Sequence, residues 1–249
     1  LAFLAVLYLI GQQVGLRYQI YGTALALIPL GVVLLAVRWV DKWEPEPRRT
    51  QIAMLLWGGG VAALGAFLVN TGAVTVFAAL HGPEAGIVVV AVGVAPVVEE
   101  TLKGLGVYLL ARYRPYLIDG PVDGLVYGML AGAGFAFTEN ILYLSGAYVS
   151  EAESETSGIV IGVFFVRAVL SPFAHAMFTG LFGLAIGWYS QGGRRHQSIL
   201  RGLAAGIVLH MLWNWSASVG EGMFFSVYVM IQVPMLLVGG YWYVRAMFY

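Results

Sequence analysis

Residues 97–103 read Val-Val-Glu-Glu-Thr-Leu-Lys, and they place two adjacent carboxylates and a lysine within an apolar run from about residue 84 to residue 112. That run has the composition and length of a membrane-spanning helix, which needs roughly 20 apolar residues. A charged side chain at the middle of a bilayer costs about 2.5 to 3.5 kcal/mol on the insertion scale. Glu99, Glu100 and Lys103 therefore need partners at the same depth.

The composition of the whole chain is that of a polytopic membrane protein. Of its 249 residues, 60% are hydrophobic and 10% are charged, whereas an ordinary soluble domain has about 25% charged residues. The 13 basic residues balance the 13 acidic ones, so nucleic-acid binding has no electrostatic support. Since cysteine is absent, structural disulfides, a thiol nucleophile and thiolate metal sites are excluded.

Apolar runs separated by short polar loops predict an all-α bundle of about eight transmembrane helices, which form a single transmembrane domain over residues 1–249. The opening run lacks a basic segment and a small-residue cleavage site, so we interpret it as a truncated or short first span and not as a signal peptide. The spans are placed near residues 1–15, 20–40, 51–80, 84–112, 121–148, 157–190, 197–218 and 222–247.

The third and sixth runs are too long for one straight span, so each is expected to contain a break. Gly58-Gly59-Gly60 or Asn70-Thr71-Gly72 can interrupt the third run. In the sixth run, Ser171-Pro172 removes a backbone donor and is expected to kink or break the helix.

The basic residues are concentrated in alternate loops, which the positive-inside rule places in the cytoplasm. With an even number of spans, both termini are then cytoplasmic. These basic residues flank the second, fourth and sixth loops and the C-terminus, and they are Arg38, Lys42, Arg48, Arg49, Arg112, Arg114, Arg194, Arg195, Arg201 and Arg245. Two further basic residues, Lys103 and Arg167, fall inside spans.

The second loop, residues 41–49, reads Asp-Lys-Trp-Glu-Pro-Glu-Pro-Arg-Arg. Pro45 and Pro47 favour an extended backbone, and Trp43 can lie among lipid headgroups. Two interpretations stay open at this point: a juxtamembrane connector, and an element that docks or gates a substrate.

Five ionisable residues on four predicted spans lie at about one depth. At about 1.5 Å per residue, Glu99 and Glu100 lie roughly 20 Å from the cytoplasmic end of their helix, as do His175 and His210 on theirs, and Glu139 is about one turn higher. Intramembrane ionisable groups face the bundle interior or a water-filled cavity. We therefore expect them to converge in a polar catalytic core within residues 84–218.

Each of these residues also has a purely structural explanation. Lys103 can neutralise Glu99 at i,i+4 or Glu100 at i,i+3, while the other carboxylate points about 100° away and needs a proton, a metal ion or water. Glu139 alone can be a protonated core acid, and a lone histidine in a span usually satisfies an interhelical hydrogen bond. Their coincidence at one depth favours a shared site.

Glu139, His175 and His210 form a set of two imidazoles and one carboxylate, a composition found in catalytic zinc sites that keep one position open for water. Glu99 or Glu100 would then be the general base that takes a proton from that water. The residues alone do not decide which of the two glutamates has this role.

A metal-free arrangement uses the same groups differently. In that arrangement a glutamate and a histidine activate water, while another histidine and Asn214 donate hydrogen bonds to the developing oxyanion. The sequence contains no His-Glu-x-x-His and no Gly-x-Ser-x-Gly motif, so it supports neither a zincin helix nor serine catalysis. Arg167, two turns before His175, is either its counter-ion or a snorkelling side chain at the outer interface.

In these motifs the sequence resembles the PrsW family of intramembrane proteases, distant relatives of the CAAX prenyl endopeptidases. The resemblance covers roughly residues 38–214. The segments that carry it are Glu44-Pro45-Glu46-Pro47, Glu99-Glu100-x-x-Lys103, Phe135-x-x-x-Glu139-Asn140, Ser171-Pro172-Phe173-Ala174-His175 and His210-x-x-Trp213-Asn214.

The resemblance implies an intramembrane endopeptidase of a prokaryotic plasma membrane that cleaves a membrane-anchored protein, such as an anti-sigma factor. It implies that Glu99 activates water, that Glu100 pairs with Lys103, and that the enzyme is a metallopeptidase, with zinc as the expected cofactor. Asn140 is expected to support the site together with Arg167. The CAAX relatives carry a histidine where this chain has Glu139, so the metal-free mechanism proposed for them is not implied here.

Two other classes of protein fit the same polar residues. Carboxylate and histidine chains also move protons in transporters, which would show ion-coupled flux. A membrane protein that has the same fold but only binds a partner, without catalysis, would keep its function when Glu99 or His175 is replaced. We expect a lipid bilayer and a membrane-anchored protein as partners, and no nucleic acid.

Overall fold

The computed structural model describes residues 1–190 and 195–237, and every regular element in that part of the chain is a helix. The α-helices are α1 (Ala2–Val14), α2 (Leu16–Val40), α3 (Arg48–Leu56), α4 (Ala63–His81), α5 (Pro83–Val89), α6 (Ala95–Tyr113), α7 (Pro121–Ser154), α8 (Ile159–Phe164), α9 (Ala174–Ser190), α10 (Arg195–Val219) and α11 (Glu221–Val227). The all-α prediction is confirmed.

Among the described residues, 5 helical segments are long and apolar enough to cross a membrane: Leu16–Val40, Arg48–His81, Pro83–Tyr113, Pro121–Ser154 and Ile159–Ser190. Ala2–Val14 and Glu221–Leu237 are shorter apolar helices. The structure therefore describes a multi-pass membrane bundle. The count of eight spans and the cytoplasmic position of both termini remain predictions, and the last predicted span lies partly outside the described residues.

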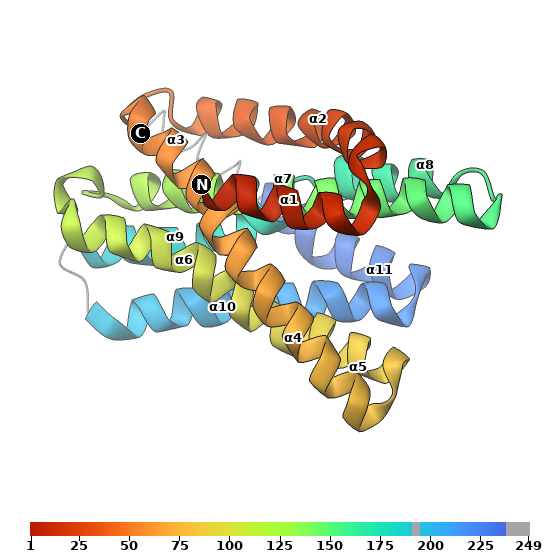
Figure 1. The fold of residues 1–249 in the computed structure, drawn as a ribbon. Helices are drawn as coiled ribbons and strands as arrows, with labels where there is room; N and C mark the ends of the chain where they lie inside the picture. The colour runs from red at the N-terminus through yellow and green to blue at the C-terminus, as the bar shows by residue number, and fades with distance from the viewer. Residues whose placement is uncertain (191–194, 238–249) are drawn as a thin grey trace.

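The connections between helices alternate between the two ends of the bundle (Figure 1). The α2–α3 and α6–α7 connections, which carry the basic residues, lie at one end, on the left of the view. The α1–α2, α4–α5, α7–α8 and α10–α11 connections lie at the other end. This arrangement agrees with the alternation of basic loops along the sequence.

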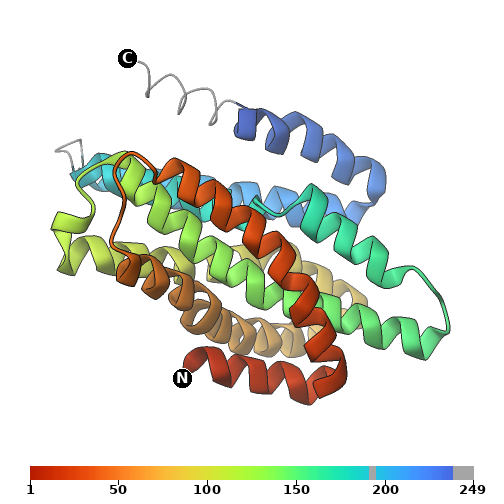
Figure 2. The same cartoon turned by 90° about the horizontal axis from the view of Figure 1, so that it is seen from above.

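Helix α7 is the most buried of the five candidate spans, and it packs most extensively against α9 and α2 (Figure 2). Small residues allow the α7 and α9 backbones to approach closely. A Cβ atom added at Gly132 would lie only 2.3 Å from the carbonyl oxygen of His175. The glycines of α7 therefore fix the position of the segment that carries this histidine.

Short π-helical turns lie within three of the described helices, at Trp57–Ala62, Val90–Val94 and Tyr228–Gln232, and a fourth, Phe165–Leu170, ends the helix that begins with α8. At Gly58-Gly59-Gly60 the sequence predicts a possible break, and the structure instead continues the helix through the first π turn. Helix α4 passes through Asn70-Thr71-Gly72 without interruption. At Ser171-Pro172 the predicted break is confirmed, because α9 begins only at Ala174.

The loop between α2 and α3 is anchored by hydrogen bonds of its acidic side chains. Asp41 accepts from the Glu46 backbone N–H at 3.0 Å and from the Gln51 side-chain amide at 2.7 Å. The Tyr127 hydroxyl of α7 donates to Glu46 Oε2 at 2.5 Å. Together with α2 and α3, the loop lines a cavity of about 510 Å³. The loop is therefore held in a defined conformation by side-chain contacts with α3 and α7.

The stability of this loop is expected to depend on pH through Glu46. Burial raises the pKa of the Glu46 carboxyl from 4.5 to about 7; the charges of Asp123 and Asp41 also raise it, whereas the Tyr127 hydroxyl lowers it. The folded protein then holds a proton that the unfolded chain releases near pH 4.5. The stabilisation is complete below that pH and is lost as the pH rises to about 7.

Limited proteolysis of the loop between pH 5 and pH 8 tests this prediction. Cleavage should accelerate as the pH rises in the wild type and should be nearly independent of pH in Glu46→Gln. Glu44→Gln, a change at an exposed residue of the same loop, should behave as the wild type does. An unchanged pH profile in Glu46→Gln would contradict the prediction.

Candidate active site

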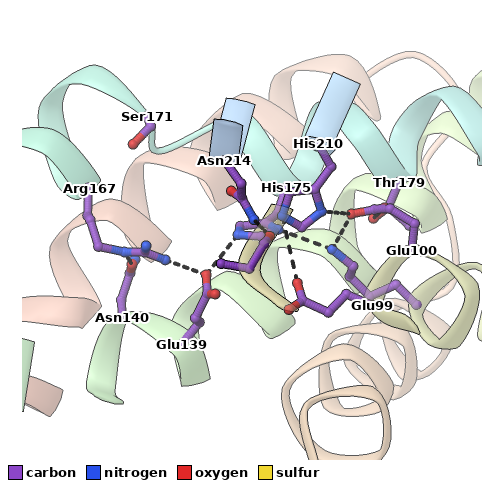
Figure 3. Close-up of polar contacts among 12 residues, drawn as sticks. Glu99, Glu100, Glu139, Asn140, Arg167, Ser171, His175, Thr179, His210 and Asn214 are labelled. Carbon is purple, nitrogen blue, oxygen red and sulfur yellow. Dashed lines mark hydrogen bonds and ion pairs between the residues drawn. The ribbon is translucent and has the colours of Figure 1, made fainter. Parts of the chain in front are cut away.

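The polar residues predicted to share one depth converge inside the bundle (Figure 3). Glu99 and Glu100 come from α6, Glu139 from α7, His175 from α9 and His210 from α10. All but Glu139 are buried. Four helices far apart in the sequence thus form one polar cluster within an apolar bundle.

Glu100 is the most fully paired carboxylate of the cluster. Lys103 Nζ lies 2.5 Å from its Oε1, and the Thr179 hydroxyl donates to its Oε2 at 2.8 Å. The Nδ1 atom of His210 lies 2.9 Å from Oε1. Every one of these contacts is buried, so Glu100 joins α6, α9 and α10 by charge-assisted hydrogen bonds.

These contacts assign the proton on His210. An ionised carboxylate can only accept, so the Nδ1–H of His210 donates to Glu100. In the neutral imidazole, Nε2 then carries a lone pair. That nitrogen faces Glu99, whose Oε2 lies 3.8 Å away.

His175 has the opposite arrangement. Lys103 Nζ lies 3.1 Å from His175 Nδ1, and an ammonium group can only donate, so Nδ1 accepts. The proton of the neutral imidazole is therefore on Nε2, which donates to Glu139 Oε2 at 2.8 Å. Lys103 also lies over the Phe135 ring, 4.4 Å from its centroid.

Arg167 lies in the π turn that precedes the Ser171-Pro172 break, and it turns toward the cluster (Figure 3). Its guanidinium forms an ion pair with Glu139 and donates to Asn140 Oδ1 at 2.6 Å. It also lies 4.2 Å from the centre of the Tyr143 ring. The structure therefore places Arg167 as the counter-ion of Glu139, and not as an outward snorkelling side chain.

Glu99 is the least satisfied member of the cluster. Its side chain is buried, and Oε1 accepts a hydrogen bond from the Asn70 amide of α4 at 3.1 Å. Its Oε2 is buried and has no hydrogen-bond partner among the described residues. A buried carboxylate oxygen without a partner is costly, so this atom marks the place where a further group is expected.

One group of possible metal ligands is found among the described residues. Donor atoms of Glu99, His175 and His210 all lie within 4.8 Å of one another. Glu139 is not a member of this group, although it contacts His175 directly. The predicted ligands Glu139, His175 and His210 all belong to the polar cluster. The group whose donor atoms converge, however, has Glu99 in the place of Glu139.

Asn214, one turn after His210 on α10, donates its side-chain amide to the carbonyl oxygen of Ala91 at 2.8 Å. Ala91 lies in the π turn that precedes α6. The bond therefore ties α10 to the segment that leads into Glu99. The second N–H of the same amide is available for another acceptor.

A cavity of about 420 Å³ leads to the cluster. Its walls are mostly apolar side chains from α1, α4, α5 and α7, and Glu99, Glu139, Tyr143 and Asn214 also line it. An apolar cavity with a few convergent polar groups is the usual form of a binding site. The cavity gives a bound molecule contact with both carboxylates that flank the imidazoles.

Two residues of the cluster are not predicted by the sequence. Asn70 is interpreted there only as part of a possible helix break, and Thr179 is not singled out. Thr179 lies one helical turn after His175, and this spacing is a signal that both share a face. Asn70 is an amide within an apolar helix, which is a weaker signal because such residues often make structural bonds.

Comparisons with known proteins identify the family of this chain. A family model described as "PrsW family intramembrane metalloprotease" matches residues 46–239. A "Protease PrsW" of Clostridioides difficile (strain 630) is 27% identical over 194 residues, which are 77% of this chain and 76% of that protein. No solved structure matches the chain.

Two further relatives with the same name match shorter segments. The protein of Geobacillus kaustophilus (strain HTA426) is 30% identical over 158 residues, 63% of this chain and 62% of that protein. The protein of Bacillus subtilis (strain 168) is 37% identical over 91 residues, 36% of this chain and 34% of that protein. The family model spans most of the chain, including all four helices of the polar cluster, and the chain therefore belongs to the PrsW family of intramembrane metalloproteases.

Proposed function

We propose that this protease cleaves a peptide bond of a membrane-anchored protein, with Glu99 as the group that takes a proton from the attacking water. The observation that supports this role is the buried Oε2 of Glu99, which has no hydrogen-bond partner among the described residues and lies 3.8 Å from His210 Nε2; Glu99 also borders the cavity. Glu100 is unsuited to the role because Lys103, Thr179 and His210 already occupy both of its oxygens.

Zinc is the proposed cofactor, and the residues present fit it. Two imidazoles and a carboxylate are the ligands of some catalytic zinc sites, and donor atoms of His175 and His210 lie within 4.8 Å of each other and of a Glu99 oxygen, which would stay beside the ion as the base and not as a ligand. We propose that His175 and His210 would hold the ion, with Glu139 as the third ligand, since Glu139 Oε2 already lies 2.8 Å from His175 Nε2. Zinc bound there would polarise the peptide carbonyl and make water more acidic.

The other residues orient these groups. Glu100 accepts the Nδ1–H of His210 and leaves its Nε2 free, as the partners of metal-binding histidines commonly do. Arg167 fixes the direction of the Glu139 carboxylate, and Asn140 in turn holds Arg167. For Nε2 of His175 to hold the ion, its proton would have to move to Nδ1, and the Lys103 amine, 3.1 Å from Nδ1, would then have to be neutral or turn away.

Asn214 is the proposed donor to the oxyanion that develops on the peptide carbonyl. Like Glu99, it lines the cavity, and its bond to Ala91 holds the amide in place, while its other N–H has no acceptor among the described residues. A preorganised donor of this kind stabilises negative charge in a site from which water is largely excluded.

The proposed substrate is a membrane-anchored protein, such as an anti-sigma factor, in the plasma membrane of a prokaryote. The apolar walls of the cavity suit a polypeptide segment that comes from the bilayer. Three of the four helices that carry the site, α6, α7 and α9, belong to segments long and apolar enough to span the membrane, so the substrate would reach the site at that depth.

Metal analysis of the purified protein tests the zinc part of the proposal. We expect zinc bound to the wild type and a loss of at least about tenfold in zinc affinity in His210→Ala, because one ligand is removed. His81→Ala, a change at an exposed histidine at the end of α4, should keep the zinc. Equal zinc contents in the two variants would contradict the assignment.

A further inference from the structure

Asn70 is an unusual residue for its position in α4. Its sequence neighbours Leu68 and Val69 are 57% and 49% exposed, as expected of a helix face in contact with lipid. A side-chain amide in hydrocarbon needs a hydrogen-bond partner, since an unpaired polar group costs free energy there. The side chain of Asn70 instead borders the cavity that leads to the polar cluster.

The partner of Asn70 is Glu99. The Nδ2 atom of Asn70 donates to Glu99 Oε1 at 3.1 Å, across 29 positions of sequence. A carboxylate can only accept, so the nitrogen of the amide and not its oxygen must face Glu99. The other end of the amide, Oδ1, is buried and accepts no hydrogen bond from the part of the chain that the structure describes. The contact with Glu99 is therefore what holds this side chain.

We propose that Asn70 is a positioning residue for the catalytic base. By occupying Oε1 it fixes the rotation of the Glu99 carboxylate and leaves Oε2 as the oxygen that meets water beside His210. This inference rests on the proposed function, in which Glu99 accepts the proton.

The two adjacent glutamates differ in the chemical nature of the group that holds each of them. Glu100 is held by the ammonium group of Lys103, whereas Asn70 is a neutral donor to Glu99. An amide orients a carboxylate by a hydrogen bond without forming an ion pair. The residue that must exchange a proton is thus held by a neutral group, and the residue that ties the helices together is held by a cation.

The location of Asn70 also connects the base to the substrate cavity. Helix α4 contributes Ala63, Ala66, Phe67 and Val74 to the cavity wall next to Asn70. A peptide segment in the cavity therefore contacts the same helix that orients the base.

Kinetic comparison of Asn70→Leu, Asn70→Gln and Val69→Leu on a single-span reporter protein tests the proposal. Leucine has nearly the shape of asparagine but cannot donate, and we expect kcat to fall about 10- to 100-fold with KM unchanged, since a misplaced group costs up to about 10²-fold. Glutamine keeps an amide and should recover part of kcat. Val69 is the exposed neighbour of Asn70 on α4 and is not among the residues that line the cavity, so Val69→Leu should resemble the wild type.

Two further measurements exclude a merely structural role. Zinc content should be unchanged in Asn70→Leu, because the proposal assigns Glu99 no part in holding the ion. In a Glu99→Gln background, Asn70→Leu should cause no further loss of kcat, because there is no base left to orient. The inference is overturned if Asn70→Leu raises KM at constant kcat, loses zinc, or lowers kcat equally in both backgrounds. If wild type and Glu99→Gln cleave equally well, the proposed function itself fails.

Discussion

Replacement of Glu99 by glutamine is expected to lower kcat by about 10² to 10⁴-fold while the protein keeps its fold and its affinity for the reporter. A general base contributes a factor of this size, and glutamine has the same shape but cannot accept the proton. The amide of Asn70 can still bond to the Oε1 atom of glutamine, so the local packing is retained. The measurement is kcat and KM on a purified single-span reporter, with thermal unfolding as the test of fold.

Glu221→Gln is the matched control for this experiment. Glu221 is an exposed carboxylate in the first turn of α11, outside the polar cluster, so the change should leave kcat within twofold or so of the wild type. A Glu99→Gln protein that retains more than about a tenth of the wild-type kcat would be incompatible with Glu99 as the base.

Replacement of Lys103 by methionine is expected to cause the largest loss of stability. Lys103 is fully buried and lies against both Glu100 and His175. Removing one partner of a buried ion pair costs about 3 to 5 kcal/mol, because the other charge is left without compensation. The free energy of unfolding in mixed micelles should fall by this amount. In contrast, Lys42→Met, at an exposed lysine of the α2–α3 loop, should change it by less than about 0.5 kcal/mol.

The double variant Glu100→Gln, Lys103→Met separates loss of the pair from exposure of a single buried charge. It removes both charges, and glutamine keeps one acceptor oxygen for His210 while its amide N–H can donate to the Thr179 hydroxyl, so the double variant should be more stable than Lys103→Met alone. Equal instability of the double and the single variant would show that the ion pair is not what Lys103 contributes.

The convergence of the site could be predicted from the sequence because charged groups in a bilayer must find one another. Ionisable side chains at one depth of the bilayer have few possible partners other than one another. The structure brings four of them into one cluster: Glu99, Glu139, His175 and His210. For the same reason the break at Ser171-Pro172 could be predicted, since proline removes a backbone donor wherever the helix packs.

Other features depend on rotations that a linear sequence does not specify. Adjacent residues on a helix point about 100° apart, so the sequence alone cannot decide whether Glu99 or Glu100 faces Lys103. The π turn at residues 57–62 shifts the register of the helix locally, and it depends on packing against α7. A charged group in the bilayer must have a partner, but Asn70 is uncharged, so this rule does not predict its contact with Glu99.

The role of the Glu46 loop shows a similar limit. Its prolines predict an extended connection, but the bond from Tyr127, which is 81 positions away in the sequence, is a tertiary contact. Only the packed bundle shows that this loop is anchored to the same helix, α7, that carries Glu139.

The most direct test of the central claim is the fate of a single-span reporter protein reconstituted with the purified chain in lipid vesicles. The account predicts that the wild type, loaded with zinc, hydrolyses one internal peptide bond of the reporter, as mass spectrometry of the two fragments would show, and that Glu99→Gln leaves the reporter intact. Equal cleavage by both proteins, or an intact reporter with folded, zinc-loaded wild type across several different spans, would contradict it.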